Sequence, residues 1–269
     1  MPAQLVFERR PRAILAVNDS LLMARRSCTH IIRNTDQLLG AFFQPIMFLV
    51  LFAAVFGGAI SKTLPPGTSY LDFLMPGIII QTVAFGSTTA AVAVCNDLQK
   101  GIVDRFRSLP MSPLAVLNGH VASNLLRSAI STVVMLVVGL VIGFRSQASV
   151  IDWLAIAGLI LLFTLAFSWL SAIVGLMAKS VEAVQWLTFV LVFPLTFAST
   201  TFVPAAGMNP ILKAFAVNQP ITQVVEAVRA LMLGRPIGNF GWLAIGWNIG
   251  ILLLAVPLAS WLFRLRASG

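Results

Sequence analysis

Long apolar stretches almost free of charge constrain this chain more than any other feature of its sequence. Several of them reach the roughly 20 residues that an α-helix needs to cross the hydrocarbon core of a bilayer. Hydrophobic residues make up 58% of the 269 residues and charged residues only 10%, whereas a soluble domain carries about 25% charged residues. So few charges could not cover a surface that faces water. The sequence therefore predicts one integral membrane domain over residues 1–269, with no linker to a second domain.

The apolar stretches predict an all-α fold, because a bilayer requires every backbone polar group to be paired inside its own segment. Six transmembrane helices are expected, at 38–60, 71–95, 121–144, 153–178, 183–200 and 240–263. A long, half-apolar connection broken by prolines covers 201–238. Two glycine pairs have the spacing of close helix crossings, and these pairs are Gly139 with Gly143 and Gly246 with Gly250.

The basic residues predict how the helices are oriented. The chain holds 18 lysines and arginines against 9 acidic residues, and twelve of the 18 fall at the two termini, in the 96–120 segment and at Lys179. Five lie on the other side, which leaves Arg127 near the start of the third span. Cytoplasmic loops carry the excess of basic residues, so both termini are expected in the cytoplasm. This distribution needs no nucleic acid to explain it.

The N-terminal segment 11–36 has the pattern of an amphipathic helix. Apolar residues recur at helical spacing, while Arg12, Arg26 and Arg33 lie on another face. A helix with arginines on its polar face is expected to lie in the membrane interface rather than to cross it. A solvated tail is the alternative.

Residues 97–109 form a second candidate amphipathic helix, between the second and third spans. Asp97 is expected to cap its N-terminus, and Pro110 is expected to stop it. Its apolar stripe consists of Leu98, Ile102, Phe106 and Leu109. Such a helix can dock into a groove on a partner protein. It can equally lie on lipid headgroups without a partner, and the residues alone leave both interpretations open.

The sequence offers no source of energy inside the spans. Ion-coupled carriers keep carboxylates or histidines within the membrane, and none is expected at mid-depth here. The segment "FGGAISKT" at 56–63 lacks the glycine that precedes the lysine of a phosphate-binding loop. No nucleophile–base pair, carboxylate pair or metal-ligand cluster is recognisable, so no catalytic, metal or cofactor site is predicted. If the chain transports uphill, another polypeptide supplies the work. A passive channel or carrier is the alternative, and a lipid-modifying enzyme is the least supported.

Two stretches resemble the permease subunits of ABC-2 type exporters, in the daunorubicin and doxorubicin resistance branch. One is "GIVDRFRSLPMSPLAVLNGHV" at 101–121, and the other is "FASTTFVPAAGMNPILKAFAVNQPITQVVEAVRAL" at 197–231. The second has the family pattern at Phe202, Pro204, Asn218, Pro220 and Arg229.

The resemblance implies that the chain is the membrane subunit of an ATP-driven exporter and is not itself an enzyme. ATP and magnesium would belong to a separate ATP-binding subunit, and a second permease, identical or paralogous, would complete the pair. The 11–36 helix would touch the ATPase, 97–109 would be the coupling helix, and 201–238 would form re-entrant helices on the outer side. The location implied is a bacterial plasma membrane. The candidate coupling residues are Arg25, Arg26, Leu98, Lys100, Gly101, Ile102, Arg105, Phe106 and Leu109.

The resemblance also implies that substrate passes along the first, second and fifth spans. Those spans carry aromatic residues interspersed with a few polar ones, which suits a hydrophobic or amphiphilic drug or lipid. The candidate substrate-path residues are Phe43, Gln44, Met47, Gln81, Phe85, Thr88, Gln185, Trp186, Phe189, Phe193 and Phe197. Lipid contact or helix packing is the alternative for each of them.

Overall fold

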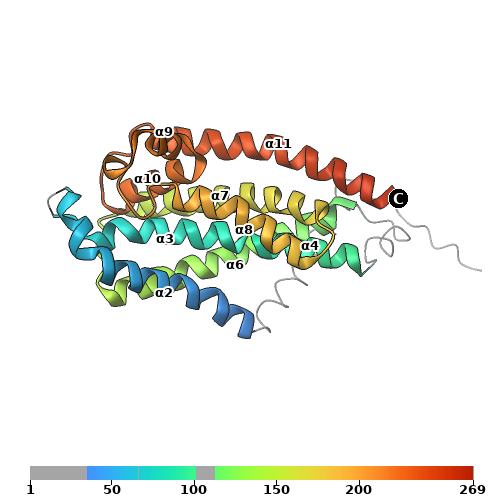
Figure 1. The fold of residues 1–269 in the computed structure, drawn as a ribbon, viewed down its shortest axis with the longest axis horizontal. Coiled ribbons are helices and arrows are strands. Elements are labelled where there is room, and N and C mark those ends of the chain that lie inside the picture. The colour runs from blue at the N-terminus through green and yellow to red at the C-terminus, as the bar shows by residue number, and fades with distance from the viewer. Residues whose placement is uncertain (1–34, 66, 101–112, 269) are drawn as a thin grey trace, which may run out of the picture.

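The protein is described by a computed structural model that covers residues 35–65, 67–100 and 113–268. Every regular element in these ranges is a helix, and the helices form an elongated bundle (Figure 1). Residues 11–34 of the expected interfacial helix and residues 101–109 of the expected coupling helix lie outside the described residues. The candidate coupling residues Arg25, Arg26, Gly101, Ile102, Arg105, Phe106 and Leu109 therefore lie outside them too.

Helices lie at all six segments predicted to cross the membrane. They are α2 (Thr35–Ile60), α3 (Tyr70–Gly86) with α4 (Thr88–Gln99), α6 (Pro113–Ile142), α7 (Val150–Met177), α8 (Val181–Phe197) and α11 (Phe240–Ser268). The connection 201–238 contains a 3-10 turn, η2 (Ala205–Gly207), and two helices, α9 (Pro210–Asn218) and α10 (Pro220–Met232). A further 3-10 turn, η1 (Ser61–Thr63), follows α2.

Five helices in the described part of the chain are long and apolar enough to cross a membrane. They cover Phe42–Thr63, Tyr70–Gln99, Val116–Ile142, Val150–Met177 and Phe240–Arg266. The continuous stretch from Tyr70 is divided by a break at Ser87. At 17 residues, α8 is shorter than these five, so a sixth crossing stays a prediction.

Local sequence explains several helix ends. The Ser69 hydroxyl accepts a hydrogen bond from the Asp72 backbone at the start of α3. At the start of α7, Ser149 and Asp152 form a reciprocal capping box. Both α9 and α10 begin with a proline, whose missing N–H costs nothing at the first helical position.

The centre of the bundle is formed by α3 and α7. Residues 73–81 of α3 are buried without interruption, and α3 packs against α2, α6, α7, α8 and α10. Its apolar side chains meet the buried rings of Phe163 and Phe167 from α7. A second apolar cluster joins α4, α6, α7 and α11 around Leu117 and Trp169. The long helices are therefore held by an extensive apolar core.

The end of the bundle that carries both flanks of the 101–112 segment is held by polar contacts. His120 on α6 lies 2.8 Å from the Asp97 carboxylate on α4. The Gln99 amide donates to the Lys179 carbonyl at 3.0 Å, and Arg266 of α11 donates to the Met177 carbonyl at 3.3 Å. These contacts tie α4, α6, α7 and α11 to one another.

The bounds of α4 correct one prediction. Asp97 does not cap a new helix, because α4 continues through it and ends at Gln99. Leu98 also belongs to α4, and Lys100 is the residue that ends this helix. The start of the predicted coupling helix at residue 97 is therefore wrong.

The opposite end contains the loops before α3 and α7 and the 201–238 connection. Ser146 donates to the Met232 carbonyl at the end of α10 at 2.9 Å, and the Arg145 backbone donates to Asp72 at 3.3 Å. Arg235 donates to the Thr68 hydroxyl. Figure 1 shows α9 and α10 gathered at this end, far from the C-terminus.

Candidate functional site

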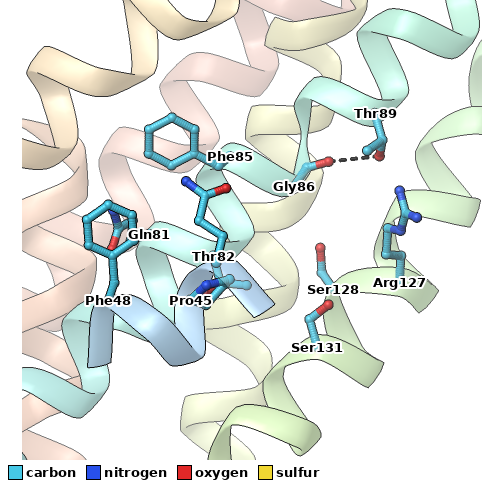
Figure 2. Close-up of a pocket in the computed structure, with 11 residues that line it drawn as sticks. Pro45, Phe48, Gln81, Thr82, Phe85, Gly86, Thr89, Arg127, Ser128 and Ser131 are labelled. Carbon is cyan, nitrogen blue, oxygen red and sulfur yellow. Dashed lines mark hydrogen bonds between the residues drawn. The ribbon is translucent and has the colours of Figure 1, made fainter. Parts of the chain in front are cut away.

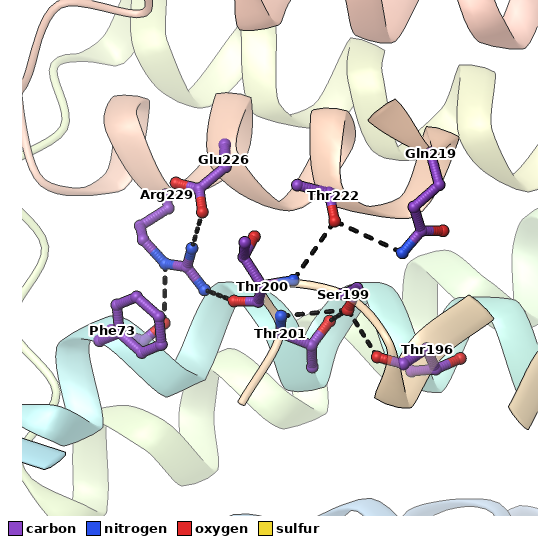
Figure 3. A network of polar contacts seen from close by, with 9 residues as sticks. All are labelled: Phe73, Thr196, Ser199, Thr200, Thr201, Gln219, Thr222, Glu226 and Arg229. Carbon is purple, nitrogen blue, oxygen red and sulfur yellow. Dashed lines mark hydrogen bonds and ion pairs between the residues drawn. The ribbon is translucent and has the colours of Figure 1, made fainter. Parts of the chain in front are cut away.

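A buried arginine fixes the turn after α8 to the core (Figure 3). Arg229 projects from α10 and donates from Nε to the Phe73 carbonyl at 2.9 Å and from Nη2 to the Thr200 carbonyl at 2.8 Å. Its third partner is the Glu226 carboxylate at 2.6 Å. The guanidinium also lies 3.7 Å from the centre of the Phe73 ring. Burial lowers the pKa of Arg229, the Glu226 carboxylate opposes that shift, and an arginine stays charged in proteins.

Further polar contacts hold the same turn. Gln219 donates to the Leu195 carbonyl at 2.7 Å and to the Ala198 carbonyl at 3.2 Å. The Thr222 hydroxyl accepts from the Thr200 backbone at 3.3 Å. The two bonds from Gln219 satisfy carbonyls that the end of α8 leaves without helical partners.

The turn also approaches α3 closely. A Cβ added at Gly77 would lie 2.6 Å from the Thr201 carbonyl oxygen, so only glycine leaves room for the backbone there. The Tyr70 hydroxyl donates to the Phe202 carbonyl at 3.0 Å. The turn is thereby fixed between α3 and α10, and this fixes the position of the Phe202 side chain.

Phe202 belongs to a continuous row of aromatic rings, which we call the aromatic ladder. Its ring stacks on Phe52 of α2 with centroids 4.5 Å apart, and it lies 4.8 Å from Phe197 of α8. Along α8 the row continues through Phe193 and Phe189, with spacings of 4.2 and 4.9 Å. The complete ladder contains Phe48, Phe52, Phe56, Phe85, Trp186, Phe189, Phe193, Phe197 and Phe202.

A pocket opens beside the ladder and shares Phe48 and Phe85 with it (Figure 2). Its volume is about 150 Å³, and it lies between α2, α6 and the junction of α3 with α4. We call it the polar pocket after the polar side chains in its lining, although most of the surface that it exposes is apolar. It is lined by Gln44, Pro45, Phe48, Gln81, Thr82, Phe85, Gly86, Thr89, Arg127, Ser128 and Ser131.

Arg127 lies further from the start of its helix than the sequence suggested. The sequence suggested a place near the membrane edge, but Arg127 lies close to the middle of the Val116–Ile142 candidate span. Its side chain is only 9% exposed, and its Nε atom is buried without a hydrogen-bond partner among the described residues. A buried cation therefore lies within this candidate span and faces a pocket.

The predicted substrate-path residues divide into two groups. The structure brings Gln44, Gln81 and Phe85 together in the polar pocket and places Trp186, Phe189, Phe193 and Phe197 in the adjoining ladder. By contrast, Phe43, Met47 and Gln185 are exposed, and none of them lines the pocket. Thr88 is also outside the lining, which contains its neighbour Thr89 instead.

The other predicted motif residues lie around the fixed turn. Pro204 precedes η2, and Asn218 is the last residue of α9, where its amide donates to the Ala214 carbonyl at 2.8 Å. Pro220 begins α10. Sequence reasoning missed Ser128 and Ser131, which line the pocket with Arg127. Ser131 occurs four residues after Arg127 and therefore shares its helix face, so that spacing is a signal that could have found it. No such signal identifies Ser128, which is the next residue in sequence.

The geometry defines a class of protein: a multi-pass α-helical membrane protein with a pocket and an aromatic row between its candidate spans. Comparison with known families gives the assignment. The model of the ABC-2 type transporter family matches residues 20–233, so the chain belongs to that family.

Curated relatives include permeases named for drug resistance. The chain is 28% identical over 244 residues to the daunorubicin resistance ABC transporter permease protein DrrB1 of Streptomyces coeruleorubidus, a match that covers 91% of this chain and 82% of the relative. It is also 28% identical over 250 residues to the probable doxorubicin resistance ABC transporter permease protein DrrC of Mycobacterium tuberculosis, with 92% and 89% covered. A putative transport permease, ycf38 of Porphyra purpurea, is 26% identical over 208 residues, with 77% and 71% covered.

Proposed function

We propose that this chain is the permease subunit of an ATP-driven exporter that moves a hydrophobic or amphiphilic drug or lipid out of the cytoplasm or the inner leaflet. A separate ATP-binding cassette subunit would bind ATP and magnesium and perform the hydrolysis. The ABC-2 family match and the permease relatives support this assignment.

The observation that carries the proposal is the continuity between the polar pocket and the aromatic ladder. Phe48 and Phe85 belong to both, so polar groups and an apolar aromatic surface adjoin along α2, α3 and α8. Ligand sites are typically apolar with a few placed polar groups. An amphiphile has a polar part and an apolar part that match these two surfaces.

Coupling to the ATPase is proposed for the segment between α4 and α6. Its two flanks are held by the contacts of Asp97 with His120 and of Gln99 with Lys179. A force applied to the segment would therefore act on several helices of the bundle. Phe106 and Arg105 are the proposed docking residues, and Arg25 and Arg26 would touch the same partner from the N-terminal segment.

A second permease is proposed to pack beside α2 and α8. Only 6% of the α2 candidate span is buried within this chain, against 61% of the Tyr70–Gln99 span. Large apolar side chains on both helices are exposed, including Phe43, Val55 and Trp186. Lipid can cover such a surface, but a second permease would enclose the ladder and the pocket.

Co-expression with a cognate ATP-binding cassette protein tests the proposal. The two proteins are expected to purify together, and ATP hydrolysis is expected to depend on the catalytic residues of the partner alone. The double variant Phe106→Ala with Arg105→Gln should separate hydrolysis from transport, whereas Lys62→Gln, exposed on η1, should leave coupling intact. Flux of the same size without nucleotide would instead support a passive channel or carrier.

A further inference from the structure

The polar pocket collects hydrogen-bond donors around Arg127, a cation with no ion-pair partner among the described residues. We propose that it binds the anionic headgroup of an amphiphile, with Arg127 as the counter-ion. The inference rests on the proposed function in one respect, which is that this amphiphile is the exporter's cargo.

Arg127 is the first reason for an anionic ligand. The ion pairs found among the described residues join His120 to Asp97 and Arg229 to Glu226, and neither involves Arg127. The pocket lining contains no aspartate or glutamate. A buried charge within a candidate membrane span is costly unless it finds a partner, and the described protein groups supply none.

The neighbours of Arg127 add further donors. Ser128 and Ser131 are buried beside it on α6, and within the described residues their hydroxyls form no hydrogen bond. Gln81 faces the same pocket from α3 with 4% of its surface exposed. Its amide nitrogen can donate into the pocket, whereas its buried oxygen, which has no partner in the described structure, is an acceptor and does not contribute to anion binding. Hydroxyl and amide groups can each donate, and a guanidinium pairs readily with phosphate or carboxylate oxygens.

The apolar side of the pocket selects an amphiphile rather than a free anion. Phe48 and Phe85 line it and continue into the aromatic ladder, with Phe85 6.5 Å from Phe189 and Phe48 6.4 Å from Phe197. An acyl chain or an aromatic ring attached to the anion would lie against these rings. A cationic headgroup at the same position would face Arg127 and find no carboxylate in the lining.

Photolabelling of the full chain in lipid nanodiscs tests the inference without any ATPase. Three diazirine lipids with the same acyl chains are compared: phosphatidic acid, phosphatidylcholine and a lipid with a trimethylammonium headgroup. Phosphatidic acid is expected to label peptides around Gln44 and Gln81 about tenfold more than the other two, the scale of a hydrogen bond to a charged group.

Variants of the pocket sharpen the test. Arg127→Gln should remove most of this preference, Arg127→Lys should keep part of it, and Arg264→Gln, an exposed control on α11, should keep all of it. Ser131→Ala should weaken the preference by about threefold, in line with the loss of one neutral hydrogen bond. If Arg127→Gln does not fold, the Ser131→Ala variant still tests the inference.

Three results would overturn the inference. One is equal labelling by the three lipids, and another is a preference that Arg127→Gln and Ser131→Ala leave unchanged. The third is complete competition by millimolar inorganic phosphate, which would show that the pocket binds a free anion. The labelling requires no partner protein. Failure of the co-expression experiment would therefore leave the labelling result unchanged, and the two failures can be told apart.

Discussion

Two buried arginines in this chain have opposite surroundings, and the contrast separates a structural role from a binding role. Arg229 has three hydrogen-bond partners and an aromatic ring beneath it. Arg127 has an unpartnered Nε in the described structure and faces a pocket. A buried charge with protein partners can hold the segments that carry those partners in place. A buried charge without protein partners requires another explanation, such as a bound ligand.

Replacement of Arg229 tests the structural role. Arg229→Gln is expected to destabilise the protein by roughly 2–4 kcal/mol, because it breaks a buried pair and frees two buried carbonyls. The decrease in the thermal unfolding temperature in detergent measures this destabilisation. Lys213→Gln, at an exposed position on α9, should change stability by no more than about 0.5 kcal/mol. Equal stability of the two variants would contradict the role given to Arg229.

The sequence identified Arg229 through a motif but placed Arg127 closer to the start of its helix than the structure does. The family pattern that includes Asn218, Pro220 and Arg229 has a spacing that sequence comparison can recognise. The depth of Arg127 depends on where α6 begins, and Pro113 begins that helix earlier than the predicted span at 121. Depth in the bundle is set by helix packing, which a single sequence does not reveal.

At the scale of elements, hydrophobic runs located the helices well, but small residues did not locate the close crossings. Within the described structure, a Cβ at Gly246 or Gly250 would meet nothing within 4 Å, and Gly143 ends α6 with a φ of +120°. Of the predicted glycines, Gly139 alone contacts another helix closely, through the flexible Met75 side chain. The tightest backbone approach is instead at Gly175 of α7, where a Cβ would lie 2.4 Å from the Ala91 carbonyl oxygen of α4.

This contact gives a matched pair of variants on one helix. Gly175→Ala should separate α4 from α7 and cost about 1–3 kcal/mol, the usual range for overpacking. Gly158→Ala on α7 meets nothing within 4 Å and should be neutral or stabilise by up to about 1 kcal/mol, because alanine favours helix. Unfolding temperatures of both variants provide the measurement. A Gly175→Ala protein as stable as Gly158→Ala would mean that the two helices do not approach as described.

The aromatic ladder gives a second test at the scale of elements. Phe193→Ala removes a ring between Phe189 and Phe197 and is expected to lower export of a hydrophobic dye several-fold at unchanged protein level. Phe215→Ala on α9 removes a ring that is 49% exposed and stands apart from the ladder, so export should be unaffected. If both variants export alike, the ladder serves packing rather than transport.

At the scale of the whole molecule, composition predicted a multi-pass membrane protein, and the helices and the family match confirm that class. Other parts of the prediction were less successful. The expected entry to the coupling helix proved to be the end of α4, because continued helix is cheaper than a new start when no breaker intervenes. The polar pocket could not be predicted, because it draws residues from α2, α3 and α6 that are far apart in sequence.

The central claim is that this bundle provides a path and borrows its energy from a separate ATPase. The most direct measurement is uptake of a fluorescent amphiphile into inside-out proteoliposomes, with the permease alone and with its cognate ATP-binding subunit. Accumulation against a gradient is predicted only when both proteins and ATP are present. Accumulation of the same size by the permease alone would contradict the claim.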